Sequence, residues 1–530
     1  MGAVRGVVAA GHPLTADVAA DVLRDGGNAV DAAVAAVLMS FVAESPLTGP
    51  GAGGFMLVHT AGGEDHLLDF FVAAPGRGRP DARPAELQPI EIRFSDDAAQ
   101  RFHIGAASCG VYGTPLGLCE ALARFGTVAL DGLVMRPARA ARDGIQISPR
   151  GAYVLEVLGP ILTSTPEARA IYAPNGRLLR AGEWIRIPEL GDLLDRLGAE
   201  GPRFLYEGDF AAAASEWVLD HGGLLTREDL AAYEVVERSP ARARYRGREV
   251  LTNPPPSSGG ILIAYALDLL ERLPRPSGGG LDVRALVRVM ERANRERTEE
   301  FSSALHSEGY LERLLAKEAM DSAAMEVRGR LGSAPRAEAS GSTGGGLGST
   351  THLSVLDADG ACASVTCSNG SCSGVVVPET GMHLNNMLGE EDLNPLGHHR
   401  HEPGRRIPSM MAPTVVLRDG QPELALGSAG SNRIRSAILQ TIVGVVDDGL
   451  SAEEAVGRDR VHLEADLVEA EPGVDPRALE ALRDEGYAVQ RWTERNLFFG
   501  GVQAVARDAA TGTVSGGGDP RRGGVSLVVA

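Results

Sequence analysis

One threonine, Thr350, stands at a sharp change in the character of the sequence. The residues before it, 333–349, are rich in glycine, serine and alanine and offer almost nothing for a core to bury. Such a composition is typical of a flexible linker. At Thr350 polar and apolar residues begin to alternate, which is typical of a β-strand. The boundary is consistent with a linker between two domains. It is also consistent with a flexible segment that leaves a reactive threonine accessible.

A threonine hydroxyl is a poor nucleophile unless a base takes its proton. An amino terminus can be that base, because its pKa of about 8 is much closer to neutral pH than the pKa of an alcohol. Thr350 would gain such an amino group if the chain were cut after Ser349. A flexible preceding segment would let the hydroxyl reach back to the Ser349 carbonyl. We therefore predict a self-cleaving chain with an N-terminal threonine nucleophile.

The strand that begins at Thr350 is predicted to form a hairpin with the next strand. Alternating residues 350–356 and 361–368 flank the turn sequence Asp-Ala-Asp-Gly. An antiparallel register through this turn places Thr350 opposite Cys367 or Ser368. We therefore expect a second hydroxyl beside the nucleophile if Ser368 is the partner.

Apolar periodicity predicts helices and strands along the rest of the chain. The expected elements are a strand at 7–10, helices at 15–24, 29–42, 190–197 and 283–301, and strands running through hairpins from 350 almost to 530, interrupted by a helix at 432–446. With 530 residues, the chain is long enough for several domains or for one large layered domain.

Composition argues against several classes of partner. The formal charge of −19 disfavours nucleic acid and anionic membrane surfaces, which both attract clustered positive charge. The most apolar early stretch, 30–42, is shorter than the roughly 20 residues of a membrane helix. The amino terminus does not resemble a signal peptide, so we expect a cytoplasmic protein.

No cofactor or metal is expected. The glycine-rich run 48–56 lacks the Gly-Lys-Ser/Thr ending of a phosphate-binding loop and the strand and helix that flank a dinucleotide fingerprint. His398, His399 and His401 fall in a stretch rich in proline, glycine and arginine, which favours a polar surface loop over a metal site.

Several short motifs occur in a characteristic order along the chain. They are Gly-Gly-Asn-Ala-Val-Asp-Ala-Ala-Val at 26–34, Gly-Ala-Gly-Gly-Phe-Met at 51–56, Pro-Pro-Pro-Ser-Ser-Gly-Gly at 254–260, Gly-Ser-Thr-Thr-His-Leu-Ser-Val around Thr350, Asn-Asn at 385–386, Pro-Ser-Met at 408–410, Gly-Ser-Ala-Gly at 427–430 and Asp-Pro-Arg at 519–521. Together they resemble the γ-glutamyltranspeptidase family over nearly the whole chain. The resemblance implies an α+β fold of four αββα layers. It also implies one precursor cut into interleaved fragments, 1–349 and 350–530, that remain together as a heterodimer.

The resemblance assigns a catalytic role to four residues. Thr350 corresponds to the nucleophile and Ser368 to the hydroxyl that supports it. Gly430 and Ser431 correspond to the two backbone amides of the oxyanion hole. Helical spacing of apolar residues over 432–446 agrees with this, since it places both amides at a helix amino end, where negative charge is stabilised.

Substrate contacts are also implied by the resemblance. Glu390 matches the acidic residue that holds the substrate's α-amino group, and Ser409 matches one of two serines that bind its α-carboxylate. Asn386 and Phe71 complete the expected substrate-binding set.

This sequence departs from the family where the substrate carboxylate would bind. Phe71 replaces the arginine that clamps the carboxylate, and Pro408 replaces the second serine. A phenyl ring cannot form the paired guanidinium–carboxylate contact. Arg405, Arg406 and Arg433 are the candidates that could restore it.

We therefore predict retained chemistry with altered specificity. The leading hypothesis is cleavage of a γ-glutamyl or related small-molecule amide through an acyl-threonine ester, with transfer of the acyl group to water or an amine. An acylase of glutaryl type, or a biosynthetic hydrolase, is the alternative that Phe71 suggests. A non-catalytic binding protein that keeps the fold is a further alternative.

Overall fold

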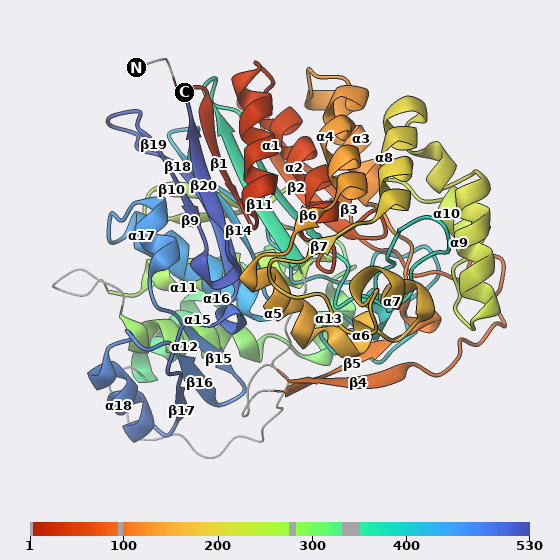
Figure 1. The fold of residues 1–530 in the computed structure, drawn as a ribbon. Coiled ribbons are helices and arrows are strands. Elements are labelled where there is room, and N and C mark those ends of the chain that lie inside the picture. The colour runs from red at the N-terminus through yellow and green to blue at the C-terminus, as the bar shows by residue number, and fades with distance from the viewer. Residues whose placement is uncertain (1–3, 94–98, 275–281, 331–349) are drawn as a thin grey trace.

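Two antiparallel β-sheets lie face to face between two layers of helices (Figure 1). This arrangement is seen in a computed structural model, which describes residues 4–93, 99–274, 282–330 and 350–530. The predicted linker, residues 333–349, lies outside the described residues. Among the described residues, no helix combines the length and apolar character needed to cross a bilayer.

The first sheet is built from strands on both sides of residue 350. Its order is β20 (Val525–Val529), β1 (Gly6–Ala10), β11 (Thr350–Asp357), β12 (Cys362–Ser368), β2 (Gly53–His59), β3 (Asp65–Phe70) and β8 (Val236–Arg238). The hairpin β11–β12 is thus flanked by β1 and β2 from the earlier part of the chain. Each neighbouring pair is antiparallel.

The second sheet packs its inner face against the first. Its order is β19 (Val514–Gly518), β18 (Gly501–Arg507), β14 (Gln421–Ala429), β13 (Thr414–Arg418), β10 (Arg248–Thr252) and β9 (Ala241–Tyr245). Phe55 and Leu57 of β2 share one buried cluster with Val415 and Leu417 of β13. This shared cluster forms an apolar layer between the two sheets.

Helices cover the outer face of each sheet. On the side of the first sheet are α1 (Pro13–Arg24), α2 (Ala29–Ala43), α3 (Thr114–Phe125), α4 (Leu130–Asp143) and α8 (Pro188–Glu200); on the side of the second are α11 (Ser258–Arg272), α12 (Val283–Arg295), α15 (Lys317–Arg330) and α16 (Arg433–Val446). Almost every residue of α2 is buried, which explains its apolar sequence. The predicted four-layer αββα fold is confirmed.

The fold also contains further helices and strands. They are β4 (Gln88–Arg93), β5 (Ala99–Ile104), β6 (Ile145–Gln146), β7 (Trp184–Ile185), α5 (Pro149–Val157), α6 (Gly159–Leu162), α7 (Pro166–Tyr172), α9 (Asp209–Asp220), α10 (Arg227–Ala231), α13 (Glu299–Ala304), α14 (Tyr310–Leu314), α17 (Ala452–Gly457), α18 (Pro476–Asp484), β15 (Val461–Glu464), β16 (Leu467–Ala470) and β17 (Ala488–Arg491).

Two predictions of secondary structure were wrong. The helix expected at 283–301 is divided, because the Thr298 side chain accepts a hydrogen bond from the Phe301 amide and begins a new helix. The region after residue 350 is not a continuous series of hairpins. Between β12 and β13 the chain forms irregular loops rich in glycine and proline, and three helices follow.

Candidate active site

Thr350 is the first residue of β11 and is 5% exposed. The strand register pairs it with Ser368, which confirms one of the two predicted partners. Thr350 Oγ1 donates a hydrogen bond to Ser368 Oγ at 3.1 Å. Ser368 Oγ also accepts a hydrogen bond from the Gly370 amide at 2.9 Å. The hydroxyl of the candidate nucleophile is therefore held by a partner that is itself fixed to the backbone.

Gly430 and Ser431 form the short link between β14 and α16. Both residues have a positive φ, +124° and +51° respectively, and such a value is uncommon for a residue other than glycine. Neither amide donates a hydrogen bond to another described residue. Both precede the amino end of a 14-residue helix, which stabilises negative charge. The link therefore has the properties of an oxyanion hole.

A small cavity of about 40 Å³ brings most of the predicted site residues together. It is lined by Thr350, Ser368, Ser431, Glu390, Ser409 and Phe71. Its remaining walls are mostly apolar: Gly370, Met387, Leu393, Met410, Met411 and Ile434, with Asp392 as a further acidic residue. We call this cavity the acyl pocket.

Glu390 lies in the wall of the acyl pocket as a buried carboxyl group. Its Oε1 accepts hydrogen bonds from the amide of Ser371 at 2.9 Å and from its hydroxyl at 2.7 Å. Burial raises the pKa of Glu390 to about 7, although the hydrogen bonds from Ser371 oppose that shift. Glu390 is therefore close to its titration point at neutral pH.

The raised pKa of Glu390 predicts that stability falls as pH rises. Between its ordinary value of 4.5 and about 7, the folded protein binds more protons here than the unfolded chain does. The resulting loss of unfolding free energy should reach about 3 kcal/mol above that range. Glu390→Gln should remove it, so thermal melts from about pH 5 to about pH 8 should show a smaller loss of Tm than in the wild type. Exposed Glu391→Gln is the matched control, and an unchanged slope in Glu390→Gln would contradict the assignment.

Asp392 is a site residue that the sequence analysis missed. Its carboxylate accepts hydrogen bonds from the Ser431 hydroxyl and, at 3.1 Å, from Asn432 Nδ2. It therefore connects the loop after β12 to the link that precedes α16. In the sequence, Glu390, Glu391 and Asp392 form a run of acidic residues that is also typical of a solvated surface. Nothing in the sequence distinguishes Asp392 from the two glutamates before it.

Asn386 was predicted to touch the substrate, but it does not line the acyl pocket. Its Oδ1 accepts a hydrogen bond from the Ser371 amide at 2.7 Å, and its Nδ2 donates to the His103 carbonyl at 3.3 Å. Both amide atoms are thus used to hold loops in place. In the described structure Asn386 is a positioning residue that supports the segment carrying Ser368 and Gly370.

Comparison with known proteins decides the family. The sequence model described as Gamma-glutamyltranspeptidase matches residues 15–529. The chain belongs to the γ-glutamyltranspeptidase family. It is 32% identical to an acylase ACY 1 proenzyme of Pseudomonas sp. (strain V22), over 99% of this chain and 94% of that one. It is 31% identical to a glutathione hydrolase proenzyme of Escherichia coli (strain K12), over 92% of this chain and 86% of that one.

Solved structures of the γ-glutamyltranspeptidase family share the fold. The cephalosporin acylase from Bacillus halodurans superposes with a TM-score of 0.84 at 27% identity, over 99% of this chain and 96% of that one. A γ-glutamyltranspeptidase from Helicobacter pylori superposes with a TM-score of 0.53 at 27% identity, over 60% of this chain and 90% of that one. The protein is therefore an enzyme of this family, an amide hydrolase or acyltransferase with a threonine nucleophile.

Phe71 lines the acyl pocket. It is 1% exposed, and its ring stacks on Phe55 with 5.4 Å between the ring centres. The side chain therefore forms an apolar wall of the acyl pocket.

None of the three candidate arginines lines the acyl pocket. Arg406 forms an ion pair with Asp69 at 3.3 Å. Arg433 donates through Nε to the Phe498 carbonyl at 3.0 Å and lies over that residue's ring. Arg405 lies 3.8 Å from a surface glutamate. All three are absent from the described lining of the acyl pocket, so that lining contains no arginine or lysine.

Proposed function

We propose that the chain matures by cleavage between Ser349 and Thr350 and then acts on amides through the freed Thr350. Ser349 lies outside the described residues, so the support comes from Thr350 itself. Its hydroxyl is oriented by Ser368, and it lines the same pocket as Ser431. The relatives named above are described as proenzymes, which agrees with such a cleavage. The products would be fragments 1–349 and 350–530, held together by the interleaved strands of the first sheet.

The proposed reaction proceeds through an ester on Thr350. Its amino group takes the hydroxyl proton as the oxygen attacks the amide carbon, and the amides of Gly430 and Ser431 stabilise the charge on the carbonyl oxygen. The carbon–nitrogen bond then breaks, and the leaving amine takes the proton. Water or another amine attacks the ester, gives up a proton through the same amino group, and returns the hydroxyl to Thr350.

We infer that the preferred acyl group carries no carboxylate. The observation behind this inference is the charge of the acyl pocket, whose described lining has two acidic residues, Glu390 and Asp392, and no basic one. A carboxylate on the acyl group would face these acidic side chains, and no basic side chain of the described lining would pair with it. Phe71 and the methionines of the pocket offer apolar contact instead. The pocket therefore fits a short, uncharged acyl group.

A γ-glutamyl donor is the second candidate, and Glu390 favours it. A carboxylate in the pocket wall is able to pair with the α-ammonium group of a γ-glutamyl residue. The α-carboxylate of the same residue would still lack a guanidinium partner in the described pocket. A glutaryl donor has the carboxylate but not the ammonium group, so it fits these charges less well than either of the others.

Three anilides that share one leaving group test the acyl preference. Butyryl anilide is uncharged, glutaryl anilide adds the carboxylate, and γ-glutamyl anilide adds both the carboxylate and the ammonium group. We expect kcat/KM for butyryl to exceed that for glutaryl by at least about tenfold, which corresponds to about 1.4 kcal/mol. A strong preference for γ-glutamyl over butyryl would overturn the inference. Such a result would establish γ-glutamyl as the preferred acyl group instead.

A further inference from the structure

The end of β11 that carries Thr350 has a strand neighbour on one edge only. β12 pairs with β11 as far as Thr350, whereas the pairing of β1 stops at Ala10 and Leu353. Beyond Ala10 the chain leaves the sheet and enters α1. No described strand therefore borders residues 350–352 on the side of β1. Since chain termini are poorly ordered unless they are tied down, a Thr350 freed by cleavage needs another restraint.

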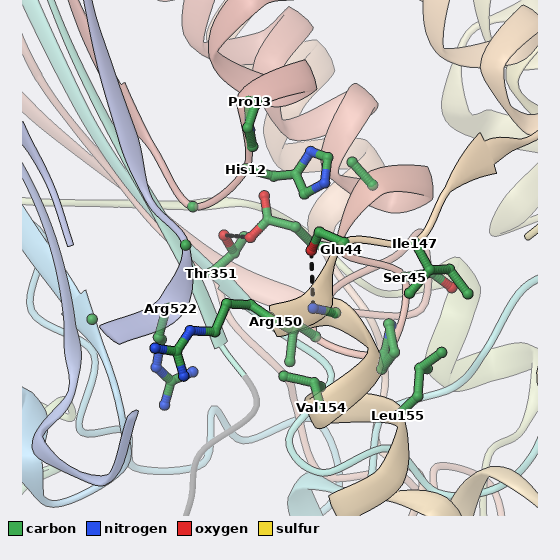
Figure 2. Close-up of a pocket in the computed structure, with 18 of the residues that line it drawn as sticks. His12, Pro13, Glu44, Ser45, Ile147, Arg150, Val154, Leu155, Thr351 and Arg522 are labelled. Carbon is green, nitrogen blue, oxygen red and sulfur yellow. Dashed lines mark hydrogen bonds between the residues drawn. The ribbon is translucent and has the colours of Figure 1, made fainter. Parts of the chain in front are cut away.

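The side chain of Glu44 supplies such a restraint. Glu44 directly follows α2 and is 8% exposed. Its Oε2 accepts a hydrogen bond from Thr351 Oγ1 at 2.5 Å, and its Oε1 accepts one from Thr15 Oγ1 at 3.0 Å. Figure 2 shows the Glu44 side chain reaching toward Thr351, the residue directly after the nucleophile. One carboxyl group thus joins the end of α2, the first turn of α1 and the start of β11.

A cavity of about 260 Å³ adjoins this contact and makes it more important. Thr350, Thr351 and Glu44 all line the cavity, and its other walls are mainly aliphatic. Protein interiors are normally close-packed, so that packing fixes most buried side chains. The described residues leave this side of Thr350 and Thr351 unpacked, and the start of β11 therefore depends on its hydrogen bonds.

Hydrogen bonds fix the first two residues of β11 from opposite faces of the sheet. Successive side chains of a strand point to opposite faces. Thr350 Oγ1 donates to Ser368, and Thr351 Oγ1 donates to Glu44. Together the two bonds oppose a rotation of the strand end about its own axis, which would turn the nucleophile away from the acyl pocket.

The charge of Glu44 is set by its burial and by three neighbouring groups. Burial raises its pKa, but the hydrogen bonds from Thr351 and Thr15 and the attraction to Arg522 oppose that rise. These three groups favour the ionised form, which accepts both hydrogen bonds. Hydrogen bonds to a carboxylate are shorter and stronger than those between neutral groups. The contact with Thr351 is therefore able to hold the strand end firmly.

We propose that Glu44 is a positioning residue for the nucleophile. By holding Thr351, it keeps the hydroxyl and the freed amino group of Thr350 aligned with the acyl pocket. This inference rests on the proposed function, because Thr350 becomes a chain end only after cleavage. Cleavage requires the Thr350 hydroxyl to reach the carbonyl directly before it in the chain, whereas turnover requires it to meet a separate molecule. A displacement of about 1 Å can cost about 10²-fold in rate. We therefore expect the loss of Glu44 to slow turnover much more than cleavage.

Removing either partner of the contact tests this role. Thr351→Val removes the hydroxyl but keeps the branched shape of the side chain, and Glu44→Ala removes the acceptor. In the matured enzyme, each should lower kcat for the best anilide of the series by at least about thirtyfold and change KM by less than about threefold. The double variant should lose no more than Glu44→Ala alone, because both single variants break the same hydrogen bond. Denaturing electrophoresis should show that these variants are still cut before Thr350.

Two further variants separate positioning from general stability. Glu44→Gln keeps an oxygen acceptor for Thr351 and should recover most of the kcat that Glu44→Ala loses. Thr15→Val is the matched control, because it removes the other hydrogen bond to Glu44 and leaves that of Thr351 in place. It should lower Tm but keep kcat within about threefold of the wild type.

The outcomes distinguish this inference from the proposed function. If Thr351→Val and Glu44→Ala leave kcat unchanged in an enzyme whose wild type is active, Glu44 does not position the nucleophile. The inference is also wrong if the two losses multiply in the double variant, or if Thr15→Val loses as much activity as Thr351→Val. If the wild type shows no turnover of any amide that depends on Thr350, the proposed function itself fails.

Discussion

Thr350→Ala is expected to leave the protein as a single chain of 530 residues and to abolish turnover. The substitution removes the hydroxyl that would attack the Ser349 carbonyl, so no new amino terminus forms. It also removes the atom that would carry the acyl group. We expect kcat to fall by at least about 10⁴-fold, as in other enzymes that lose their nucleophile. Denaturing electrophoresis, sequencing of the fragment ends and amidase assays measure both effects.

Thr350→Ser is the matched control because it keeps both the hydroxyl and, after cleavage, the amino group. It should be cut at the same bond and should retain activity. A Thr350→Ala protein that remains active without cleavage would contradict the proposed mechanism. A wild-type protein that never yields a fragment beginning at Thr350 would instead favour a non-catalytic binding protein with the same fold.

Gly430→Ala is expected to lower kcat by about 10²- to 10³-fold, the range measured when one donor of an oxyanion hole is lost. Gly430 has a φ of +124°, which an alanine rarely adopts. A Cβ atom added there would also lie 3.0 Å from the Cα atom of Gly500. The link must therefore shift, and the two amides would no longer point at the carbonyl oxygen. Steady-state kinetics on the matured enzyme should show the loss mainly in kcat.

Gly420→Ala provides the control for backbone strain. Gly420 also has a positive φ, +77°, but it lies in the turn between β13 and β14, and an added Cβ atom would meet no heavy atom within 4 Å. This variant should lose about 1 kcal/mol of stability and keep its kcat. Equal losses of activity in both glycine variants would mean that Gly430 acts through general stability and not through the oxyanion hole.

The sequence predicted those features of the site that depend on the order of residues within one hairpin or one helix. Alternation and a four-residue turn were enough to place Ser368 as a possible partner of Thr350, because hairpin register follows from the turn. Helical spacing over 432–446 was enough to place Gly430 and Ser431 at a helix amino end. The same local reasoning failed at Thr298, where one side chain ends a periodic pattern by capping a new helix.

The features that set specificity were decided by tertiary structure. Phe71 and Asp392 are far apart along the chain, and no periodicity relates them to Thr350. Their places depend on how irregular loops and the two sheets pack, so only the folded structure shows which side chains face the acyl pocket. The sequence by itself therefore determined the nucleophile and its immediate partner. The tertiary structure decided that no arginine lines the described acyl pocket beside Phe71, because the lining depends on contacts between distant segments.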